Sequence, residues 1–386
     1  MISGQYEFLD QDRVVFGIPA AQAVLGQSSG AKRIFIVASN TLSKKTAVVE
    51  DIRRVLGEAV CGVFDECVEH VPRSGVVRLV EVLREIEPDL IVTIGGGTPI
   101  DTVKLALLCL AEGISAEHEL DAYRIRVLSD GSKHVPRVGA PPVRQIAIPT
   151  TLSGAEFSNL AGCSDPVRQV KDLYTGREIG AQVVILDPAV TIYTPDWLWL
   201  STGVRALDHA VETVCSRAPQ PFTDATCLHA ISILDRALRR IKQEPNDMQA
   251  RLDCQLGVWL ASTGLGRVEW GASHGIGHQL GAIAGVAYGY TSCIMLHNVL
   301  RFNYECNADR QHLVAQALGS SAAQAADLIA NLVRSLSMPL RLRDVGVDKN
   351  QLTSIAQASL QNMMVRSNPR PIKSEDEVLF LLEQAW

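Results

Sequence analysis

The chain has 386 residues, 47% of them hydrophobic and 20% charged, with a formal net charge of −6 at pH 7. This composition is ordinary for a globular protein, and the length is sufficient for two domains with separate cores. The acidic balance argues against nucleic acid or an anionic membrane as a main partner. No apolar run approaches the roughly 18 residues that a membrane span requires.

The cysteines and the N-terminal residues indicate the compartment. The nine cysteines include no CxxC pair and read as reduced thiols rather than as a disulfide framework or a zinc site. The first residues carry acids where a signal peptide would need a basic start and an apolar stretch. We therefore expect a cytoplasmic protein.

The first half of the chain alternates expected strands with expected helices. Strands are expected at residues 13–17, 33–39, 60–68, 90–94, 145–151 and 181–187, and helices at residues 45–56, 74–86 and after 97. Such alternation predicts a Rossmann-like, doubly wound parallel sheet, which binds ligands beyond the carboxyl ends of its strands. The polar, proline-bearing segment 113–143 is expected to be an inserted loop.

A glycine turn lies at the centre of this half, in the stretch DLIVTIGGGTPIDTVKLALL. The apolar run at 90–94 predicts a buried strand, and Thr98 and Pro99 suit a helix cap and first turn. Because Gly95, Gly96 and Gly97 lack a Cβ atom, an anionic group such as a diphosphate could approach their backbone amides. The alternative is a tight strand–helix turn that binds no ligand.

The second half of the chain carries almost only helical patterns. Helices are expected at residues 201–216, 224–241, 248–264, 322–336 and 376–384. We therefore predict two domains, an α/β domain at 1–189 and an all-α domain at 190–386.

Four segments together resemble the iron-containing alcohol dehydrogenase family, also called group III. They are IGGGTPIDTVK, IPTTLSGAE, LDPAVTIYTPDWLWLSTGVRALDHAVE and SHGIGHQLGAIAGVAYG, and they follow the family's order over residues 10–310. The resemblance implies a dinucleotide-binding domain at 1–189, a helical substrate and catalytic domain at 190–386, a small-molecule substrate and a homodimer.

The resemblance also assigns the cofactor residues. Residues 95–97 and Asp101 match the family's diphosphate-contacting motif, with Thr98 in place of its serine, and Thr150 and Thr151 match a second cofactor-contacting segment. Members that prefer NAD often place an acid after the second strand, but Ser39 stands there in this chain, with two lysines nearby. Both NAD(H) and NADP(H) are therefore expected as possible cofactors. The alternative is that the lysines form a solvated helix start and contact no phosphate.

The metal-binding helix departs from the family. Its pattern is GxDALxHAxE, in which an Asp and a His four residues apart share one face and grip a divalent ion. Here the helix reads GVRALDHAVE: His209 matches, but Arg205 replaces the Asp. Asp208 adjoins His209 and points about a third of a turn away from it, so we predict that it is a poor substitute.

The other metal-binding positions are only partly kept. His274 matches the third ligand, and His278 matches a further active-site histidine of the family. Tyr288 stands where the fourth ligand is expected. We therefore predict no stoichiometric divalent metal; if one is retained, His209 and His274 are its ligands.

A second comparison points to one branch of the family. The segment PTTLSGAE is one residue shorter than the usual PTTAGTGSE and has the length of PTTYAGSE in the maleylacetate reductases. That branch also lacks the metal-binding Asp and reduces ketones that carry carboxylates, but it keeps a histidine where Tyr288 stands here. The branch serves as an analogy for ketone reduction without a metal.

Without a metal, a carbonyl that accepts hydride needs another source of polarisation and a proton. Arg205 can bind a carboxylate, and a histidine can protonate an alkoxide. His278 is our first choice as proton donor; the other candidate groups are His274, His209 and Tyr288. The alternatives are that the histidines are core residues and that Arg205 pairs with Asp208 or Glu212.

We predict an NAD(P)-dependent oxidoreductase that interconverts a carbonyl and an alcohol, with a small carboxylate-bearing ketone or aldehyde as substrate. One alternative is an alcohol dehydrogenase that depends on Fe²⁺ or Zn²⁺, held by His209, His274 and His278. A second alternative is a nucleotide-binding protein that has lost catalysis together with its metal.

Overall fold

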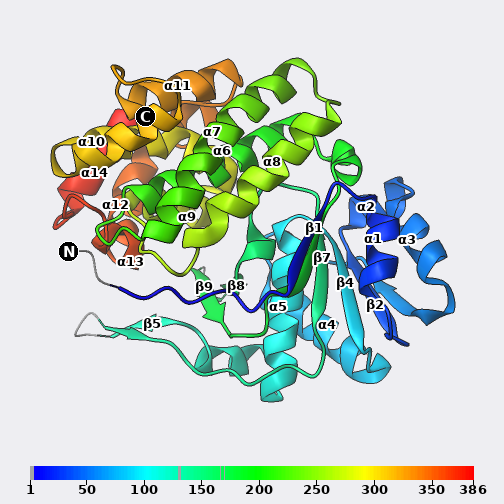
Figure 1. Ribbon diagram of the computed structural model, residues 1–386. Helices are drawn as coiled ribbons and strands as arrows, with labels where there is room; N and C mark the ends of the chain where they lie inside the picture. The colour runs from blue at the N-terminus through cyan, green and yellow to red at the C-terminus, as the bar shows by residue number, and fades with distance from the viewer. Residues whose placement is uncertain (1–3, 129–131, 166, 169) are drawn as a thin grey trace. The chain divides into compact units, whose positions relative to one another are not determined.

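The computed structural model describes residues 4–128, 132–165, 167–168 and 170–386. The chain forms two compact units, one of residues 8–194 and one that joins residues 4–7 to residues 195–386 (Figure 1). Within the described ranges, no helix combines the length and the apolar character that crossing a bilayer requires.

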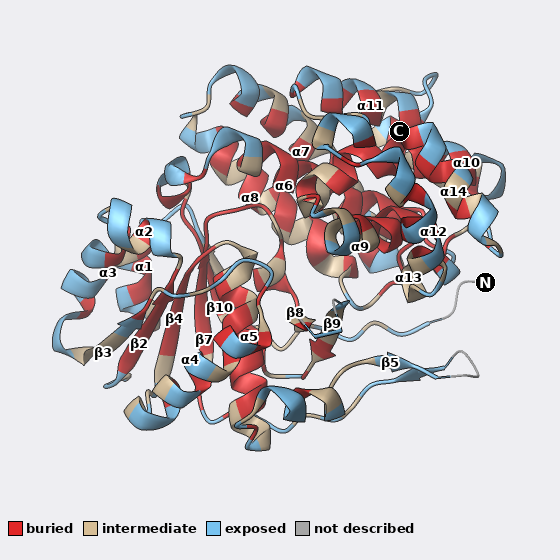
Figure 2. Ribbon diagram, turned by 180° about the vertical axis from the view of Figure 1, so that it is seen from behind, coloured by how far each residue is buried: buried red, intermediate tan, exposed pale blue. Residues whose placement is uncertain are grey.

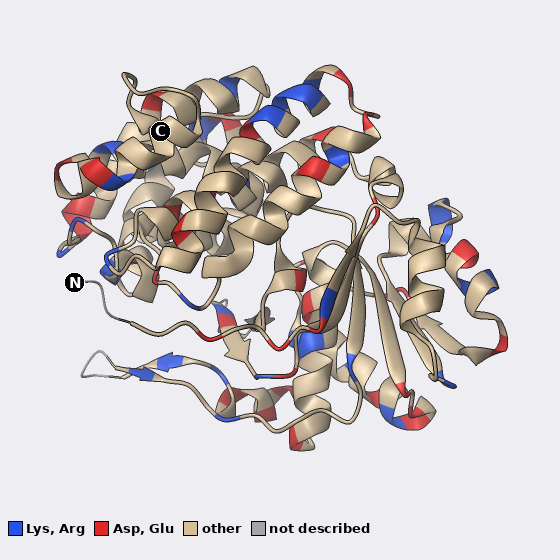
Figure 3. Cartoon of the chain, in the orientation of Figure 1, with Lys and Arg blue, Asp and Glu red and all other residues tan. Residues whose placement is uncertain are grey.

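The first unit is built on a six-stranded parallel sheet with the strand order β1-β10-β7-β4-β2-β3. Its interior strands are buried on both faces, because apolar residues, many of them Ile or Val, occupy most positions. Figure 3 accordingly shows few charged residues along these strands. The strands are β1 (Arg13–Phe16), β2 (Ile34–Ala38), β3 (Val60–Phe64), β4 (Leu90–Gly95), β7 (Gln145–Pro149) and β10 (Ala181–Leu186).

Helices cover both faces of this sheet. On one face, α1 (Ala20–Gln27), α2 (Asn40–Lys45) and α3 (Val48–Leu56) share a core with the strands. On the other face, α4 (Arg73–Ile86) and α5 (Gly97–Glu112) form a second core. The buried faces of α5 and the sheet are visible in Figure 2. The predicted doubly wound parallel sheet is confirmed.

The predicted helix cap after the glycine turn is wrong. Helix α5 begins at Gly97 with Gly96 as its N-cap, and no side chain caps it. Thr98 lies inside the first turn, where its carbonyl accepts a hydrogen bond from Thr102 Oγ1 at 2.8 Å. The amides at this helix start are therefore not engaged by a capping side chain, as an anion-binding helix end requires.

Two hairpins were not predicted. Segment 113–143, expected to be a loop, contains the 3₁₀ turn η2 (Glu117–Ala122) and the short antiparallel pair β5 (Arg126–Val127) and β6 (Lys133–His134); residues 129–131 lie outside the described ranges. Strands β8 (Leu160–Asp165) and β9 (Val170–Thr175) form a second antiparallel pair. The buried guanidinium of Arg73 joins this pair to α4 through Asp165, at 3.3 Å, and Asp172, at 3.0 Å.

The second unit is helical, as predicted. It contains α6 (Asp196–Val214), α7 (Pro221–Gln243), α8 (Met248–Ala261), α9 (Ala272–Ala284), α10 (Tyr288–Ala317), α11 (Ala325–Ser335), α12 (Leu352–Leu360), α13 (Met363–Arg366) and α14 (Glu375–Ala385). Helix α6 packs against α7, α8 and α10 and is buried along most of its length. The polar side chains of α6 must therefore find partners inside the protein.

Candidate functional site

The predicted cofactor residues lie together at one edge of the sheet. Strands β7, β4 and β2 are neighbours, so the segments that follow them meet at their carboxyl ends. The amide of Ser39 donates to Ile94 O at 3.1 Å, and the amide of Thr150 donates to Gly95 O at 3.0 Å. A Cβ atom on Gly96 would lie 2.8 Å from Thr151 Cγ2.

The glycine turn is shaped so that a side chain would fill it. Gly95 has φ of +150°, a conformation that favours glycine, and a Cβ atom there would lie 2.6 Å from Pro99 Cγ. The bare backbone next to an uncapped helix start fits an anionic group such as the diphosphate of a dinucleotide.

A buried ionic cluster supports this turn. Asp101 Oδ1 lies 3.0 Å from Lys104 Nζ, and the fully buried Lys104 also donates to Leu160 O at 2.8 Å. Glu156 is buried close by, and this burial raises the pKa of its carboxyl to about 7, although the charge of Lys104 acts in the opposite direction. Lys104 and Glu156 were not singled out from the sequence.

In the helical unit, two of the predicted histidines lie side by side. The rings of His209 on α6 and His274 on α9 have centroids 5.0 Å apart. Trp270 covers both rings, at 4.8 Å from His209 and 4.2 Å from His274. Trp270 was missed, because nothing in its local sequence marks it as a neighbour of α6.

The other predicted catalytic residues adjoin this pair. Tyr288 begins α10, and its ring centroid lies 5.1 Å from Arg205 Cζ and 5.9 Å from the ring centroid of His278. The charge of Arg205 also acts on both His209 and His274. The structure therefore brings together all five residues predicted for catalysis.

Arg205 is held by α10 rather than by the acids of its own helix. Its Nη1 donates to Tyr288 O at 3.3 Å and to Ser292 Oγ at 3.4 Å. Burial lowers the pKa of Arg205, while the charges of Asp208, Tyr288 and Glu212 raise it. Because a guanidinium ordinarily titrates above pH 12, Arg205 remains a cation near neutral pH.

Both buried histidines are neutral near pH 7. Burial lowers the pKa of His209 and of His274 well below the ordinary value, and the charge of Arg205 lowers both further. A neutral imidazole offers one N–H donor and one acceptor nitrogen. Among the described residues, His209 Nδ1 and His274 Nε2 lack a hydrogen-bond partner.

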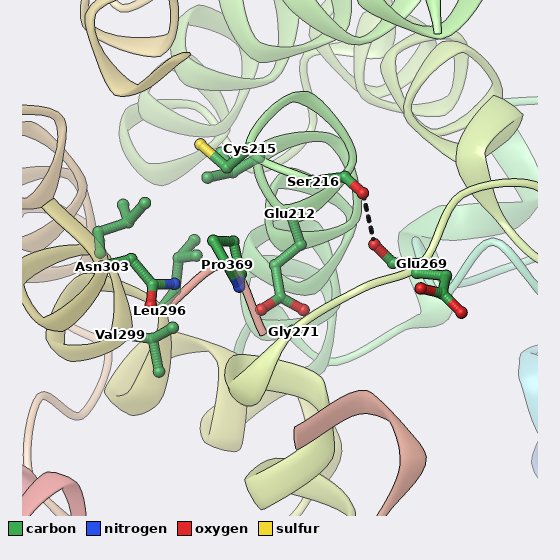
Figure 4. A pocket seen from close by; sticks show the side chains of 11 residues that line it. Glu212, Cys215, Ser216, Glu269, Gly271, Leu296, Val299, Asn303 and Pro369 are labelled. Atoms are coloured by element: carbon green, nitrogen blue, oxygen red, sulfur yellow. Dashed lines mark hydrogen bonds between the residues drawn. The ribbon is translucent and has the colours of Figure 1, made fainter. Parts of the chain in front are cut away.

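Glu212 fixes the start of α9 and the ring of His274. Its carboxylate accepts hydrogen bonds from the amides of Ser273, at 3.0 Å, and His274, at 3.3 Å. It also lies 2.8 Å from His274 Nδ1. Glu212 lines a cavity of about 10 Å³, roughly the room of one water molecule, and Figure 4 shows its side chain among the other residues that line this cavity. Burial raises the pKa of Glu212 to about 7, and backbone N–H groups oppose this shift.

Asp208 belongs to the same buried cluster. Its Oδ2 accepts a hydrogen bond from Ser273 Oγ at 2.7 Å and lies 3.6 Å from His274 Nδ1. Burial and the charge of Glu212 raise the pKa of Asp208 well above the ordinary value. Helical spacing predicted that Asp208 points away from the metal-binding residues. It could not show that α9 packs against the side chain of Asp208.

The residues present do not match the ligand set of a divalent ion. Asp208, Glu212 and His274 are close enough to share one, but Glu212 is engaged by the start of α9 and His274 Nδ1 faces Glu212. Among the described residues, the donors left without a hydrogen-bond partner are Asp208 Oδ1, His209 Nδ1 and His274 Nε2. The charge of Arg205 acts on all three of these groups, and a fixed cation in this place repels a divalent ion.

A doubly wound sheet with a glycine turn and a helical unit with a histidine cluster lie in one chain, an arrangement that fits an enzyme that binds a dinucleotide. The chain matches the model of "Iron-containing alcohol dehydrogenase" over residues 12–188 and that of "Fe-containing alcohol dehydrogenase family, C-terminal" over residues 199–386. It therefore belongs to the iron-containing alcohol dehydrogenase family and is an oxidoreductase.

Its relatives include enzymes named as dehydrogenases and reductases. The chain is 31% identical to Dehydrogenase ALT3 of Alternaria alternata, covering 92% of this chain and 99% of the relative. It is 26% identical to Maleylacetate reductase 1 of Cupriavidus pinatubonensis, covering 94% and 92%, in agreement with the resemblance to that branch. The structure of sulfoacetaldehyde reductase from Bifidobacterium kashiwanohense in complex with NAD⁺ shares the fold, with a TM-score of 0.86 and 20% identity over 99% of each chain.

Proposed function

We propose that this protein uses NAD(H) or NADP(H) to reduce a small carboxylate-bearing ketone or aldehyde without a divalent metal. The observation that carries the proposal is the place of Arg205. It occupies the family's carboxylate-ligand position on α6, contacts Tyr288 at a second ligand position, and acts electrostatically on both remaining histidines.

The cofactor role rests on the edge of the sheet. When bound, the nicotinamide supplies the hydride that reduces the carbonyl carbon. The residues proposed to hold the dinucleotide are Ser39, Gly95, Gly96, Gly97, Thr98, Asp101, Thr150 and Thr151. The uncapped start of α5 and the bare glycine turn support a diphosphate at this edge.

Different polar groups of the helical unit bind the substrate, stabilise the developing charge and donate the proton. Arg205 binds the substrate carboxylate or stabilises the alkoxide as negative charge develops on oxygen. A guanidinium is a poor proton donor near neutral pH, so the proton comes from another group. His278 remains our first choice, because burial and Arg205 keep His274 in its neutral form. In this arrangement Glu212 orients His274.

A specific observation favours a second candidate, the metal-dependent alcohol dehydrogenase. His209 Nδ1 and His274 Nε2 are buried without a hydrogen-bond partner among the described residues, and such nitrogens can bind an ion. The guanidinium beside them is the counter-argument, because it would repel that ion.

Metal analysis and a substrate panel together separate these candidates. Protein purified without chelator is analysed for metal, and NADH and NADPH oxidation is followed with small oxo acids and with their uncharged esters. We expect far less than one divalent ion per chain, activity that survives chelation, and a preference for the acids. About one ion per chain with loss of activity on chelation would establish the metal-dependent enzyme. Cofactor binding with no turnover on any substrate would indicate a nucleotide-binding protein without catalysis.

A further inference from the structure

Among the described residues, Lys104 is the one lysine that is buried, and its side chain is fully enclosed. Its ammonium group lies 3.0 Å from Asp101 Oδ1 and donates to Leu160 O at 2.8 Å. A lysine is almost always exposed, because burying an ammonium group is costly unless the group is paired. The pair with Asp101 therefore makes it possible to bury a positive charge inside α5.

Asp101 places a carboxylate close to the start of α5. It follows Gly97 by four residues, so the two share one face of the helix, and side chains on a helix lean toward its N-terminus. The side chain of Asp101 keeps 19% of its exposed surface. A carboxylate in this position repels an anion that approaches the uncapped amides of the first turn.

Two contacts hold this carboxylate against β8. Its Oδ1 is paired with Lys104, and its Oδ2 accepts a hydrogen bond from the amide of Gly162 at 3.4 Å. Leu160, the other partner of Lys104, lies on the same strand. Lys104 therefore offsets the charge of Asp101 and also ties it to β8. Without Lys104, the carboxylate would be left unpaired and freer to turn toward the helix start.

Two other charged side chains lie close to this pair. Burial raises the pKa of Glu156 to about 7, so at about pH 6 most of this carboxyl is uncharged. A Cβ atom on Gly162 would lie 3.1 Å from the Nζ of Lys171. Lys171 is only partly buried, so solvent screens its charge more than that of Lys104. At about pH 6 the local charge beneath the helix start is therefore governed mainly by Asp101 and Lys104.

We propose that Lys104 is a positioning residue that acts through Asp101. It offsets the charge of this carboxylate and holds it against β8, so that the start of α5 accepts the diphosphate of the cofactor. The inference rests on the proposed function. Because the effect is electrostatic, it acts on ligands that carry phosphate and spares the uncharged adenosine part of the cofactor.

A double-mutant cycle with two ligands tests this role. Lys104→Gln, Asp101→Asn and the double variant are compared at about pH 6 in their affinity for ADP-ribose and for adenosine, measured by displacement of bound NADH. We expect Lys104→Gln to weaken ADP-ribose binding at least about tenfold and adenosine binding less than about twofold. The double variant should recover most of the loss, because it no longer contains the unpaired carboxylate.

Asp101→Asn tests the same role while Lys104 stays in place, which matters if Lys104→Gln folds poorly. The amide keeps a hydrogen-bonding side chain but removes the negative charge, so ADP-ribose should bind at least as tightly as to the unchanged protein. Arg54→Met is the matched control. It breaks an exposed pair with Asp51 at the same helical spacing, 2.9 Å long, on α3, and should leave both affinities unchanged.

Three results would overturn the positioning role. They are an equal loss of ADP-ribose and adenosine binding in Lys104→Gln, a double variant that recovers nothing, and weaker ADP-ribose binding in Asp101→Asn. If Gly97→Ala weakens dinucleotide binding while Lys104→Gln does not, the inference is wrong and the proposed cofactor site stands. If the unchanged protein binds neither NADH nor NADPH, the proposed function itself fails.

Discussion

At the scale of single residues, the most informative position is Arg205. A residue four places before His209 shares its helix face, so the cation was expected beside the histidines, and its effect on their pKa values agrees with this. The alternative, a direct pair with Asp208 or Glu212, is not what the structure has, because the guanidinium donates to Tyr288 O and Ser292 Oγ.

We expect Arg205→Met to lower kcat/KM about a hundredfold or more, because it removes a preorganised donor and a fixed charge. Cofactor affinity, measured by fluorescence titration, should be nearly unchanged. Arg205→Lys keeps the charge but not the fork, and we expect intermediate activity. A lowered thermal midpoint with near-native kcat/KM in Arg205→Met would instead give Arg205 a structural role.

Arg205→Asp tests whether restoring the carboxylate alone is enough to restore metal binding. It restores the family's carboxylate at this position but leaves Tyr288 at another ligand position. We therefore expect neither stoichiometric metal nor metal-dependent activity in this variant, measured by metal analysis after dialysis against Zn²⁺ or Fe²⁺. Stoichiometric binding with restored turnover would show that a single substitution separates this site from a metal centre.

Spacing along one helix predicted which residues share a face, but not what packs against that face. Arg205 and His209 were therefore placed correctly relative to each other. Asp208 was judged by the direction in which it points from its helix, and its contact with Ser273 depends on how α9 packs against α6. Trp270 and the capping role of Glu212 likewise depend on that packing.

At the scale of elements, the β4–α5 turn is where sequence and structure agree best. A continuous apolar run followed by glycines predicted a buried strand and a bare turn. The exact helix start was not predictable, because Gly96 can act as N-cap as well as a threonine side chain can. Strands β8 and β9 were missed because their mixed polar sequences alternate weakly, and the buried contacts of Arg73 help to hold them in place.

The turn offers a clean test of cofactor binding. A Cβ atom on Gly97 would meet Ser153 Oγ at 3.2 Å and Ala155 Cβ at 3.7 Å, so alanine fits with a small adjustment. Because that methyl group stands where a diphosphate would approach, Gly97→Ala should weaken NADH and NADPH binding at least tenfold, about 1.4 kcal/mol. Gly96→Val is less suitable, because its Cβ already lies within 2.8 Å of Thr151.

Gly26→Ala is the matched control for this measurement. A Cβ atom there meets no heavy atom within 4 Å, and the residue lies in α1, away from the turn. We expect its dinucleotide affinity in isothermal titration to equal that of the unchanged protein. Unaltered affinity in a folded Gly97→Ala variant would remove the glycine turn from the cofactor site.

At the scale of the whole molecule, composition and periodicity predicted an α/β unit and a helical unit, each with a core of its own. Those patterns reflect which apolar side chains are buried, and this determines the structure of most segments. The ionic groups inside each unit could not be predicted in the same way, because a buried Lys104 or Glu156 is an exception to the apolar pattern. A buried ionic group of this kind changes how the free energy of unfolding depends on pH.

Glu156 gives a specific expectation for that dependence. Burial raises the pKa of its carboxyl from 4.5 to about 7 in the folded chain. Below about pH 4.5 the carboxyl is protonated in both the folded and the unfolded chain, so it adds no pH dependence there. Between about pH 4.5 and 7 the unfolded chain releases the proton while the folded chain keeps it. The free energy of unfolding therefore falls as pH rises through this window, by up to about 3 kcal/mol.

Glu156→Gln removes this titration, so its unfolding free energy relative to the unchanged protein should rise between about pH 5 and pH 8. The difference is measured by urea unfolding at the two pH values, with the exposed Glu81→Gln on α4 as control. The comparison isolates one carboxyl because the other titrating groups are common to both proteins. A loss of stability that is equal at both pH values would contradict the expectation. It would mean that Glu156 is ionised throughout and that its charge interaction with Lys104 outweighs the cost of burial.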